Sequence, residues 1–427
     1  MIFLIVGMLI VLLATGMPIF AALGLTSLVV LWFFEGSIWS MADSVFASLN
    51  NPVLATIPMF AFMAHVMVKA KVVDDLYEMS NKLVGHIKGG LGFATILSCT
   101  IFATISGSSV ATALTIGSTA IPQMQRFGYR PRDTYGIIAA GGTLGILIPP
   151  SAPMILYAVV TNASIGGLFL AGLVPGLIIA VFFAVFSWFQ ANAHGETQAQ
   201  AWPGTRAVLS AFWSSFWAVM MPPVILGGIY LGVFTAAEAA AVGAIYALLV
   251  AVLVYRNVSV RDLVDCLWQT TRTCAMLFMI IAAAGMFGHA ITIIRLPAEV
   301  MEAVAALGLS QTGFILVVML AVFVLGMFLE TIAIILISTP IILPAMLALD
   351  INPIWYGILL MINLELALIT PPVGMNLFVI KGITNAPLSQ IMRGAAPYVG
   401  ILIFGLFLVW LFPQLALWLP QQSGFGR

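Results

Sequence analysis

The chain has 427 residues, of which 62% are hydrophobic and only 7% are charged. Soluble domains carry roughly 25% charged residues, so this composition excludes a soluble domain and indicates a polytopic membrane protein. Its 15 basic and 15 acidic residues cancel. No net charge therefore attracts nucleic acid, and only the placement of charges along the chain is informative.

The first 90 residues predict three spans and one surface helix. Residues 1–34 are apolar and interrupted at Gly16-Met17-Pro18, so we interpret them as two spans; no basic residue precedes them, as it would in a cleaved signal. A third span is expected at 52–68. Residues 72–87 place apolar and charged side chains at helical spacing, which predicts an amphipathic helix in the membrane interface.

Residues 89–126 predict a re-entrant helical hairpin. The segment is apolar except at Ser106-Gly107-Ser108-Ser109, and basic residues lie on both of its sides. Basic flanks mark the cytoplasmic face, so the segment should enter and leave the membrane on that face. Irregular backbone at its tip is tolerated at membrane depth only inside protein or against water.

Much of residues 135–176 returns in the second half of the chain. Tyr135-Gly136-Ile137 recurs as Tyr356-Gly357-Ile358, and Pro149-Pro150 recurs 222 residues later as Pro371-Pro372. In both copies the prolines interrupt an apolar stretch long enough to cross a bilayer. Interrupted segments at matching positions of two halves indicate the binding site of a transporter.

The repeated sequence predicts a second hairpin at 309–349, with its tip at 326–331. Its flanks carry Glu299, Glu302 and Asp350, which points to the opposite face of the membrane. The sequence therefore predicts an all-α polytopic fold with two inverted repeats, each of about five spans plus one re-entrant hairpin. The other expected spans are 134–160, 165–193, 210–231, 236–255, 273–294, 354–380 and 395–418, with a second amphipathic helix at 296–307.

This order divides the chain into four parts. Residues 1–88 and 195–308 are predicted to form a scaffold, each with one amphipathic arm. Residues 89–194 and 309–427 are predicted to form the two halves of a transport domain, each with one hairpin. Both termini should be periplasmic.

Polar groups at predicted membrane depth are the candidate functional residues. Unwound backbone at 148–151 and 370–374 frees carbonyls for a hard cation such as sodium, and helix N-termini there suit a substrate carboxylate. The hydroxyls could instead bond helix carbonyls. Glu330 and Glu365 could be ion partners, proton sites or structural caps, and Asn162, Asn376 and Asn385 could orient substrate or cap helices. The candidate substrate contacts are Ser109, Thr112, Ser151, Glu330, Thr331 and Asn376.

Motifs for other energy sources and for catalysis are missing from the sequence. There is no GxxxxGK[ST] phosphate loop, and no GxSxG or HExxH motif, so direct use of ATP and an intramembrane hydrolase are not supported. The cysteines lack CxxC spacing and the histidines lack ligand spacing, which gives no metal site. We expect no enzyme, and an ion gradient is the remaining energy supply.

Four motifs together resemble a known family. They are Ser106-Gly-Ser-Ser-Val-Ala-Thr-Ala, Gly145-Ile-Leu-Ile-Pro-Pro-Ser, Gly326-Met-Phe-Leu-Glu-Thr and Leu368-Ile-Thr-Pro-Pro-Val-Gly-Met-Asn. With them, essentially the whole chain resembles the large membrane subunit of tripartite ATP-independent periplasmic (TRAP) transporters. The resemblance implies a sodium-coupled importer of the bacterial inner membrane with the elevator fold of the ion-transporter superfamily. It also implies two partners, a small membrane subunit and a periplasmic substrate-binding protein.

The resemblance also implies site residues. The family's first sodium site corresponds to Ser106 and Ser108 with the backbone of Gly145, Ile148 and Pro150. Its second corresponds to Gly326, Thr370, Val373 and Gly374. Sialic-acid members have an acidic residue at the position of Thr112, so the threonine favours a C4-dicarboxylate or another small organic acid.

Two other classes remain open at this point. A stand-alone sodium/dicarboxylate symporter would share the inverted hairpins but would need no binding protein. A purely structural membrane subunit would show no sodium-dependent flux. Transport with and without an added binding protein separates these alternatives.

Overall fold

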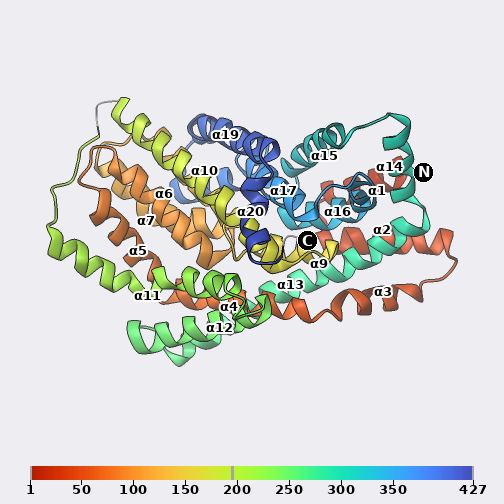
Figure 1. The fold of residues 1–427 in the computed structure, drawn as a ribbon, viewed down its shortest axis with the longest axis horizontal. Helices are drawn as coiled ribbons and strands as arrows, with labels where there is room; N and C mark the ends of the chain where they lie inside the picture. The colour runs from red at the N-terminus through yellow and green to blue at the C-terminus, as the bar shows by residue number, and fades with distance from the viewer. Residues whose placement is uncertain (1, 194–196, 426–427) are drawn as a thin grey trace.

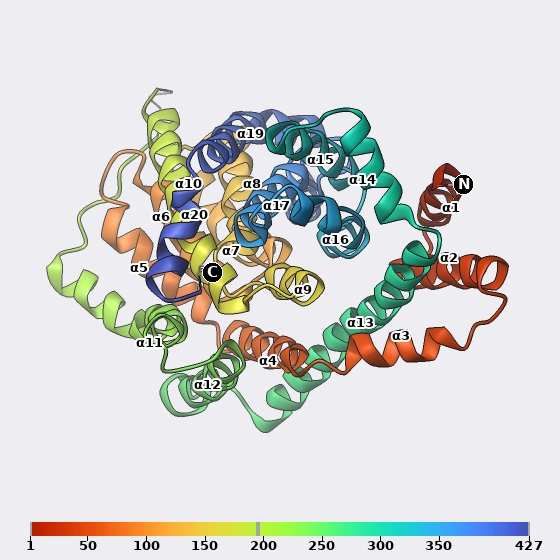
Figure 2. The same cartoon turned by 45° about the vertical axis from the view of Figure 1, so that its right-hand side comes forward.

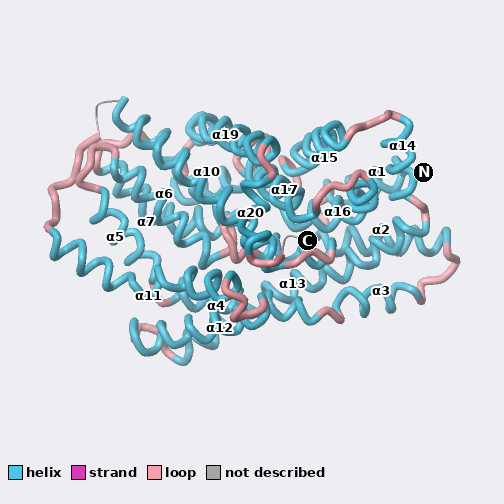
Figure 3. Tube along the Cα trace, viewed as in Figure 1, coloured by secondary structure: helices cyan, strands magenta, loops and turns pink. Residues whose placement is uncertain are grey.

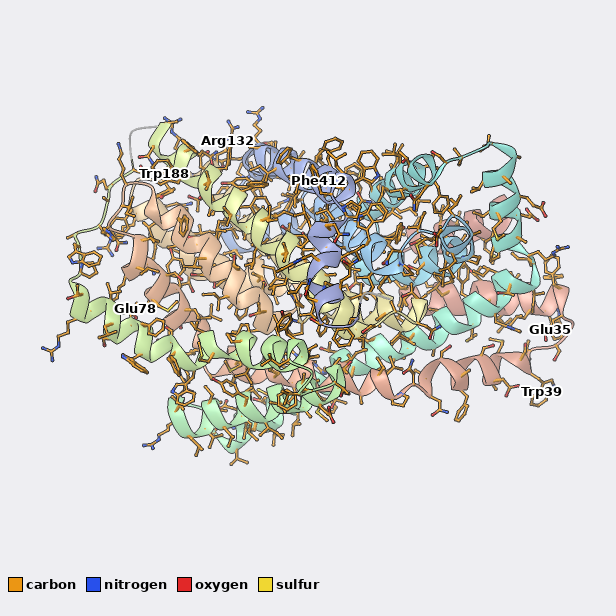
Figure 4. The ribbon with its side chains drawn as sticks, viewed as in Figure 1. Glu35, Trp39, Glu78, Arg132, Trp188 and Phe412 are labelled. Carbon is orange, nitrogen blue, oxygen red and sulfur yellow. The ribbon has the colours of Figure 1, made fainter. Side chains whose placement is uncertain are left out.

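The computed structural model describes residues 2–193 and 197–425 (Figure 1). Helices and connecting loops make up this part of the chain, and it contains no strand (Figure 3). In eight of its segments the helices are long and apolar enough to cross a membrane. Charged side chains such as Glu35, Glu78 and Arg132 lie at the margins of the molecule (Figure 4), as expected for a protein with an apolar middle.

The first half contains the two predicted helices of 1–34, the amphipathic helix and the first hairpin. Its elements are α1 (Ile2–Ala14), α2 (Ile19–Phe34), α3 (Ser40–Leu49), η1 (Pro52–Ala55), α4 (Thr56–Lys69), α5 (Val72–Val84), α6 (Gly90–Ser106), α7 (Ser109–Arg126), α8 (Pro131–Leu147), α9 (Ala152–Thr161) and α10 (Ile165–Ala193).

The second half repeats this order. Its elements are α11 (Thr205–Tyr230), α12 (Ala236–Leu249), η2 (Val250–Tyr255), α13 (Val260–Ile293), α14 (Leu296–Ala306), α15 (Gln311–Gly326), α16 (Thr331–Ala348), α17 (Pro353–Leu368), α18 (Met375–Thr384), α19 (Leu388–Leu411) and α20 (Gln414–Gln422).

Backbone conformation repeats along with the element order. Lys71 and Arg295, which precede the surface helices α5 and α14, both have positive φ, and so do Asn162 and Asn385, which end α9 and α18. The packing is also reciprocal: α9 packs on α16, and its counterpart α18 packs on α7. The second helix of each broken span, α9 or α18, thus packs on the hairpin of the other half. The predicted fold class, an all-α membrane protein of two inverted repeats, is confirmed.

The long helix α13 lies beside the second hairpin. The 34 residues of α13 pack against α2, α3 and α4 on one side and reach α16 on the other, and Figure 2 shows α13 running beside α2 and α3 along the lower right. The helix begins 13 residues before the expected start at 273. Ser259 and Asp262 form a capping box there, which starts a helix although the following turns are polar.

Two further elements differ from the prediction. The helix α3 was not expected, because its sequence mixes polar and apolar residues and is shorter than a span. The last predicted span, 395–418, is divided into α19 and α20 at Phe412 and Pro413. A proline there removes a helical donor and redirects the chain.

Candidate functional site

A cavity of about 330 Å³ lies where the hairpin tips meet α4 and α13. Both proline-broken spans reach it, through Pro150 and Ser151 of the first and Leu368 and Met375 of the second. The predicted site residues that line it are Ser106, Ser108, Ser109, Pro150, Ser151, Glu330 and Thr331. The structure therefore brings residues from four separated segments of the chain to one place.

Glycines allow the first hairpin tip to approach the first break. Gly107 has φ +58°, and a Cβ there would stand 2.6 Å from the carbonyl oxygen of Pro150. A Cβ at Gly145 would stand 2.5 Å from the carbonyl oxygen of Ser108. Only glycine fits such a close approach of two backbones. The structure thus places Ser106, Ser108, Gly145 and Pro150 together, and Ile148 is buried in the same break.

Hydrogen bonds from hydroxyl groups stabilise this tip. The hydroxyls of Ser106 and Thr112 lie 2.8 Å apart, and the Thr112 hydroxyl donates to the Ser108 carbonyl at 2.8 Å. The Ser109 hydroxyl donates to the carbonyl of Thr143 in α8 at 3.1 Å. Thr112 is fully buried and lies behind the tip rather than on the cavity wall. Its position suits support of the tip better than direct contact with a substrate.

The second break has related geometry. A Cβ at Gly326 would stand 2.6 Å from the Cβ of Ala367, one turn before the break, and Gly374 has φ +57°. The Thr370 hydroxyl donates to the Leu366 carbonyl at 2.6 Å. Gly326 and Gly374 are buried and Val373 is partly exposed. These four predicted residues thus surround one break but do not themselves line the cavity.

The acidic and amide candidates are placed differently from one another. Glu330 immediately precedes α16, where it lines the cavity with Thr331. Glu365 is fully buried in α17, and its Oε1 accepts the amide hydrogen of Leu147 at 2.9 Å. Asn376 is buried, and neither of its side-chain polar atoms has a hydrogen-bond partner among residues 2–193 and 197–425.

Four helix N-termini converge on the cavity. The first residues of α7, α9, α16 and α18 line it: Ser109, Ala152, Thr331 and Met375. Helix N-termini present free amide hydrogens and a partial positive charge. Within the described residues, no lysine or arginine lines the cavity. Backbone amides and hydroxyls are therefore the groups at this cavity that could attract an anion.

Sequence reasoning missed the wall of the cavity opposite the hairpin tips. It consists of residues from α4 and α13 that include Phe60, His65, Thr273, Met276 and Leu277. His65 was examined only as a metal ligand. As a polar side chain inside an apolar span it could have been recognised as a cavity residue.

Comparison with known proteins gives a consistent result. Residues 6–415 match the sequence family described as "Tripartite ATP-independent periplasmic transporter, DctM component". The chain is 40% identical over 406 residues to a C4-dicarboxylate TRAP transporter large permease protein of Pseudomonas aeruginosa, covering 95% of each chain. It is 33% identical to an ectoine TRAP transporter large permease protein of Halomonas elongata, covering 96% of this chain and 97% of that one.

A solved structure supports the fold alone. The crystal structure of the Alcanivorax borkumensis YdaH transporter matches with a TM-score of 0.64 at 12% identity, covering 91% of this chain and 89% of that one. The sequence matches are far closer and extend over nearly the whole chain. The protein therefore belongs to the family of DctM components, the large permeases of TRAP transporters.

Proposed function

We propose that this chain is the large permease subunit of a sodium-coupled importer of a small organic acid, with a C4-dicarboxylate the favoured substrate. The observation that carries the proposal is the cavity at which four helix N-termini and a set of hydroxyls converge between two broken spans. Such a site suits a carboxylate. Bacterial inner-membrane location follows from the same role.

Sodium is proposed as the coupling ion because both breaks offer neutral oxygens. Hard cations take carbonyl and hydroxyl oxygens, and an unwound stretch has carbonyls that a continuous helix commits to its own hydrogen bonds. The first set is Ser106 and Ser108 with the backbone of Gly145, Ile148 and Pro150. The second is Thr370 with the backbone of Gly326, Val373 and Gly374. In each set the close glycine contacts hold the hairpin against the break.

The C4-dicarboxylate rests on the names of relatives and on Thr112. Large permeases named for C4-dicarboxylates are 40%, 35% and 35% identical to this chain. Other relatives are an isethionate permease protein and large permeases named for ectoine and sialic acid. Thr112 is neutral, and among the described residues Glu330 is the only acidic one that lines the cavity. The proposed substrate contacts are Ser109, Ser151, Glu330 and Thr331, which line the cavity, and Thr112 is proposed to support the hairpin tip behind them. Asn376, buried next to the cavity-lining Met375, is proposed as a further substrate contact.

The proposed partners are a small membrane subunit and a periplasmic binding protein, as the description of a three-part transporter suggests. Transport would proceed by an elevator movement, in which the hairpins and broken spans shift against α4 and α13. The cavity lies between these two groups of helices, which is where such movement would expose it to one side of the membrane and then the other.

Uptake by proteoliposomes tests the proposal. We expect labelled succinate to accumulate only with an inward sodium gradient, the small subunit and a binding protein. Accumulation that needs sodium but no binding protein would favour a stand-alone symporter. Absence of sodium-dependent flux with every candidate binding protein would reject the transport proposal.

A further inference from the structure

Glu365 connects the two broken spans. It lies in α17, five residues before Thr370 and so just before the second break, and its side chain is fully buried. Its Oε1 accepts a 2.9 Å hydrogen bond from the amide of Leu147, the last residue of α8, directly before the first break. One carboxyl group thus spans from one half of the transporter to the other at the level of both breaks.

The two halves of the chain differ at this position. The residue 222 positions before Glu365 is Thr143, whose hydroxyl donates within its own helix to the carbonyl of Ala140 at 2.7 Å. The backbone carbonyl of Thr143 accepts from Ser109 at the first hairpin tip. At this position the side chain of the first half therefore bonds within its own helix, whereas the side chain of the second half bonds to the backbone of the first half.

The carboxyl group of Glu365 is unusual for a purely structural contact. Its Oε2 is buried and has no hydrogen-bond partner in the described part of the chain. A buried polar atom without a partner is destabilising, and a well-packed apolar side chain at such a position is often at least as stable. Stability alone therefore does not account for a carboxyl here.

The contact joins the two proposed ion sites. The Leu147 amide precedes Ile148, whose carbonyl belongs to the first proposed set. Glu365 precedes Leu366, whose carbonyl holds the hydroxyl of Thr370 in the second. The Glu365–Leu147 bond is therefore a direct link through which a change in backbone position at one break would reach the other.

We propose that Glu365 is a positioning residue that couples the two breaks, so that sodium binding at one site favours binding at the other. The inference rests on the proposed function, since it needs both sodium sites. The accepting oxygen, rather than a charge, is what carries the coupling. Glu365→Gln keeps that oxygen, and Glu365→Met removes it with a side chain of similar length.

The test is sodium binding to the purified large subunit, measured by calorimetry with sodium chloride against choline chloride. We expect a Hill coefficient above one for the wild type and for Glu365→Gln. For Glu365→Met we expect a coefficient near one and about a tenfold rise in the half-saturating sodium concentration. Glu365→Asp, which is too short to reach Leu147, should behave like the methionine variant and serves if that variant does not fold.

A neighbouring residue provides the matched control. Asn363 is buried in the same helix, and its amide donates to the Met319 carbonyl at 2.8 Å, a bond that stays within the second half. Asn363→Leu should lower the melting temperature and leave the Hill coefficient unchanged. A wild-type coefficient of one, an unchanged coefficient in Glu365→Met, or equal loss in Glu365→Gln would overturn the inference. A wild type that binds no sodium would instead reject the proposed function.

Discussion

Replacing Gly145 by alanine should separate the first hairpin tip from the first break. The added methyl would stand 2.5 Å from the carbonyl carbon and oxygen of Ser108 and 2.7 Å from the amide nitrogen of Ser109. All three atoms belong to the backbone, so no side chain can rotate away. Since ordinary carbon contacts begin near 3.5 Å, the tip must move by about 1 Å.

That displacement is large for an ion site. Metal–ligand distances tolerate only about 0.2 Å of error, so an outward shift of the Ser108 segment should remove its oxygens from a sodium ion held by the carbonyls of the break. Loss of about 1.4 kcal/mol in ion binding raises the sodium needed for half-maximal uptake tenfold. Overpacking at such a contact also costs about 1–3 kcal/mol of stability.

The assay is uptake against sodium concentration in proteoliposomes, together with the melting temperature. Gly400→Ala is the control, because Gly400 lies in α19 and a Cβ there would meet nothing within 4 Å beyond its chain neighbours and the adjoining backbone of its own helix. It should keep the wild-type sodium curve and gain up to about 1 kcal/mol of stability, as alanine usually does in a helix. A Gly145→Ala protein with the wild-type sodium curve would refute the reasoning.

Three further predictions address the ligands, the topology and the movement. Ser106→Ala and Thr370→Ala should each raise the half-maximal sodium concentration about tenfold; lowered melting temperatures with unchanged sodium curves would assign both hydroxyls to structure, at about 1 kcal/mol per lost hydrogen bond. Single cysteines at Arg130 and Asp350 should be labelled from the cytoplasm and the periplasm respectively, and labelling from the same side would contradict the orientation. In a background without Cys99, Cys266 and Cys274, a disulfide between cysteines at Leu277 and Ile332 should stop uptake and its reduction should restore it; undiminished uptake by the cross-linked protein would exclude relative movement of α13 and α16.

The broken spans and hairpins could be predicted because glycine and proline leave a local signal. A proline pair inside an apolar stretch interrupts a helix wherever it folds. In the structure one pair lies between α8 and α9 and the other between α17 and α18. The tip at Gly107 was readable for the same reason. The start of α13 was not, because a capping box is a weak signal when the first turns behind it are polar. The prediction began that helix at its first wholly apolar stretch.

Side-chain direction at the hairpin tips could not be read from the sequence. Ser109 and Thr112 were grouped as candidate substrate contacts because both are polar residues at predicted membrane depth near the same hairpin tip. In the structure they lie one turn of α7 apart: Ser109 lines the cavity, and the hydroxyl of Thr112 contacts that of Ser106 behind the tip. A residue's depth in the membrane follows from its sequence position, but the direction in which its side chain points depends on where the neighbouring helices pack.

The cavity wall formed by α4 and α13 shows why part of the cavity was beyond prediction. Residues of an apolar helix that face lipid and those that face protein have the same composition, because lipid tails are as apolar as leucine. Leu277 of α13 therefore carries no mark that distinguishes it from its lipid-facing neighbours. His65 does, since a polar side chain at membrane depth is retained only where it meets a partner or a cavity. The spacing of His65 from other histidines is uninformative, whereas its position within an apolar span indicates that this part of α4 lies beside a cavity.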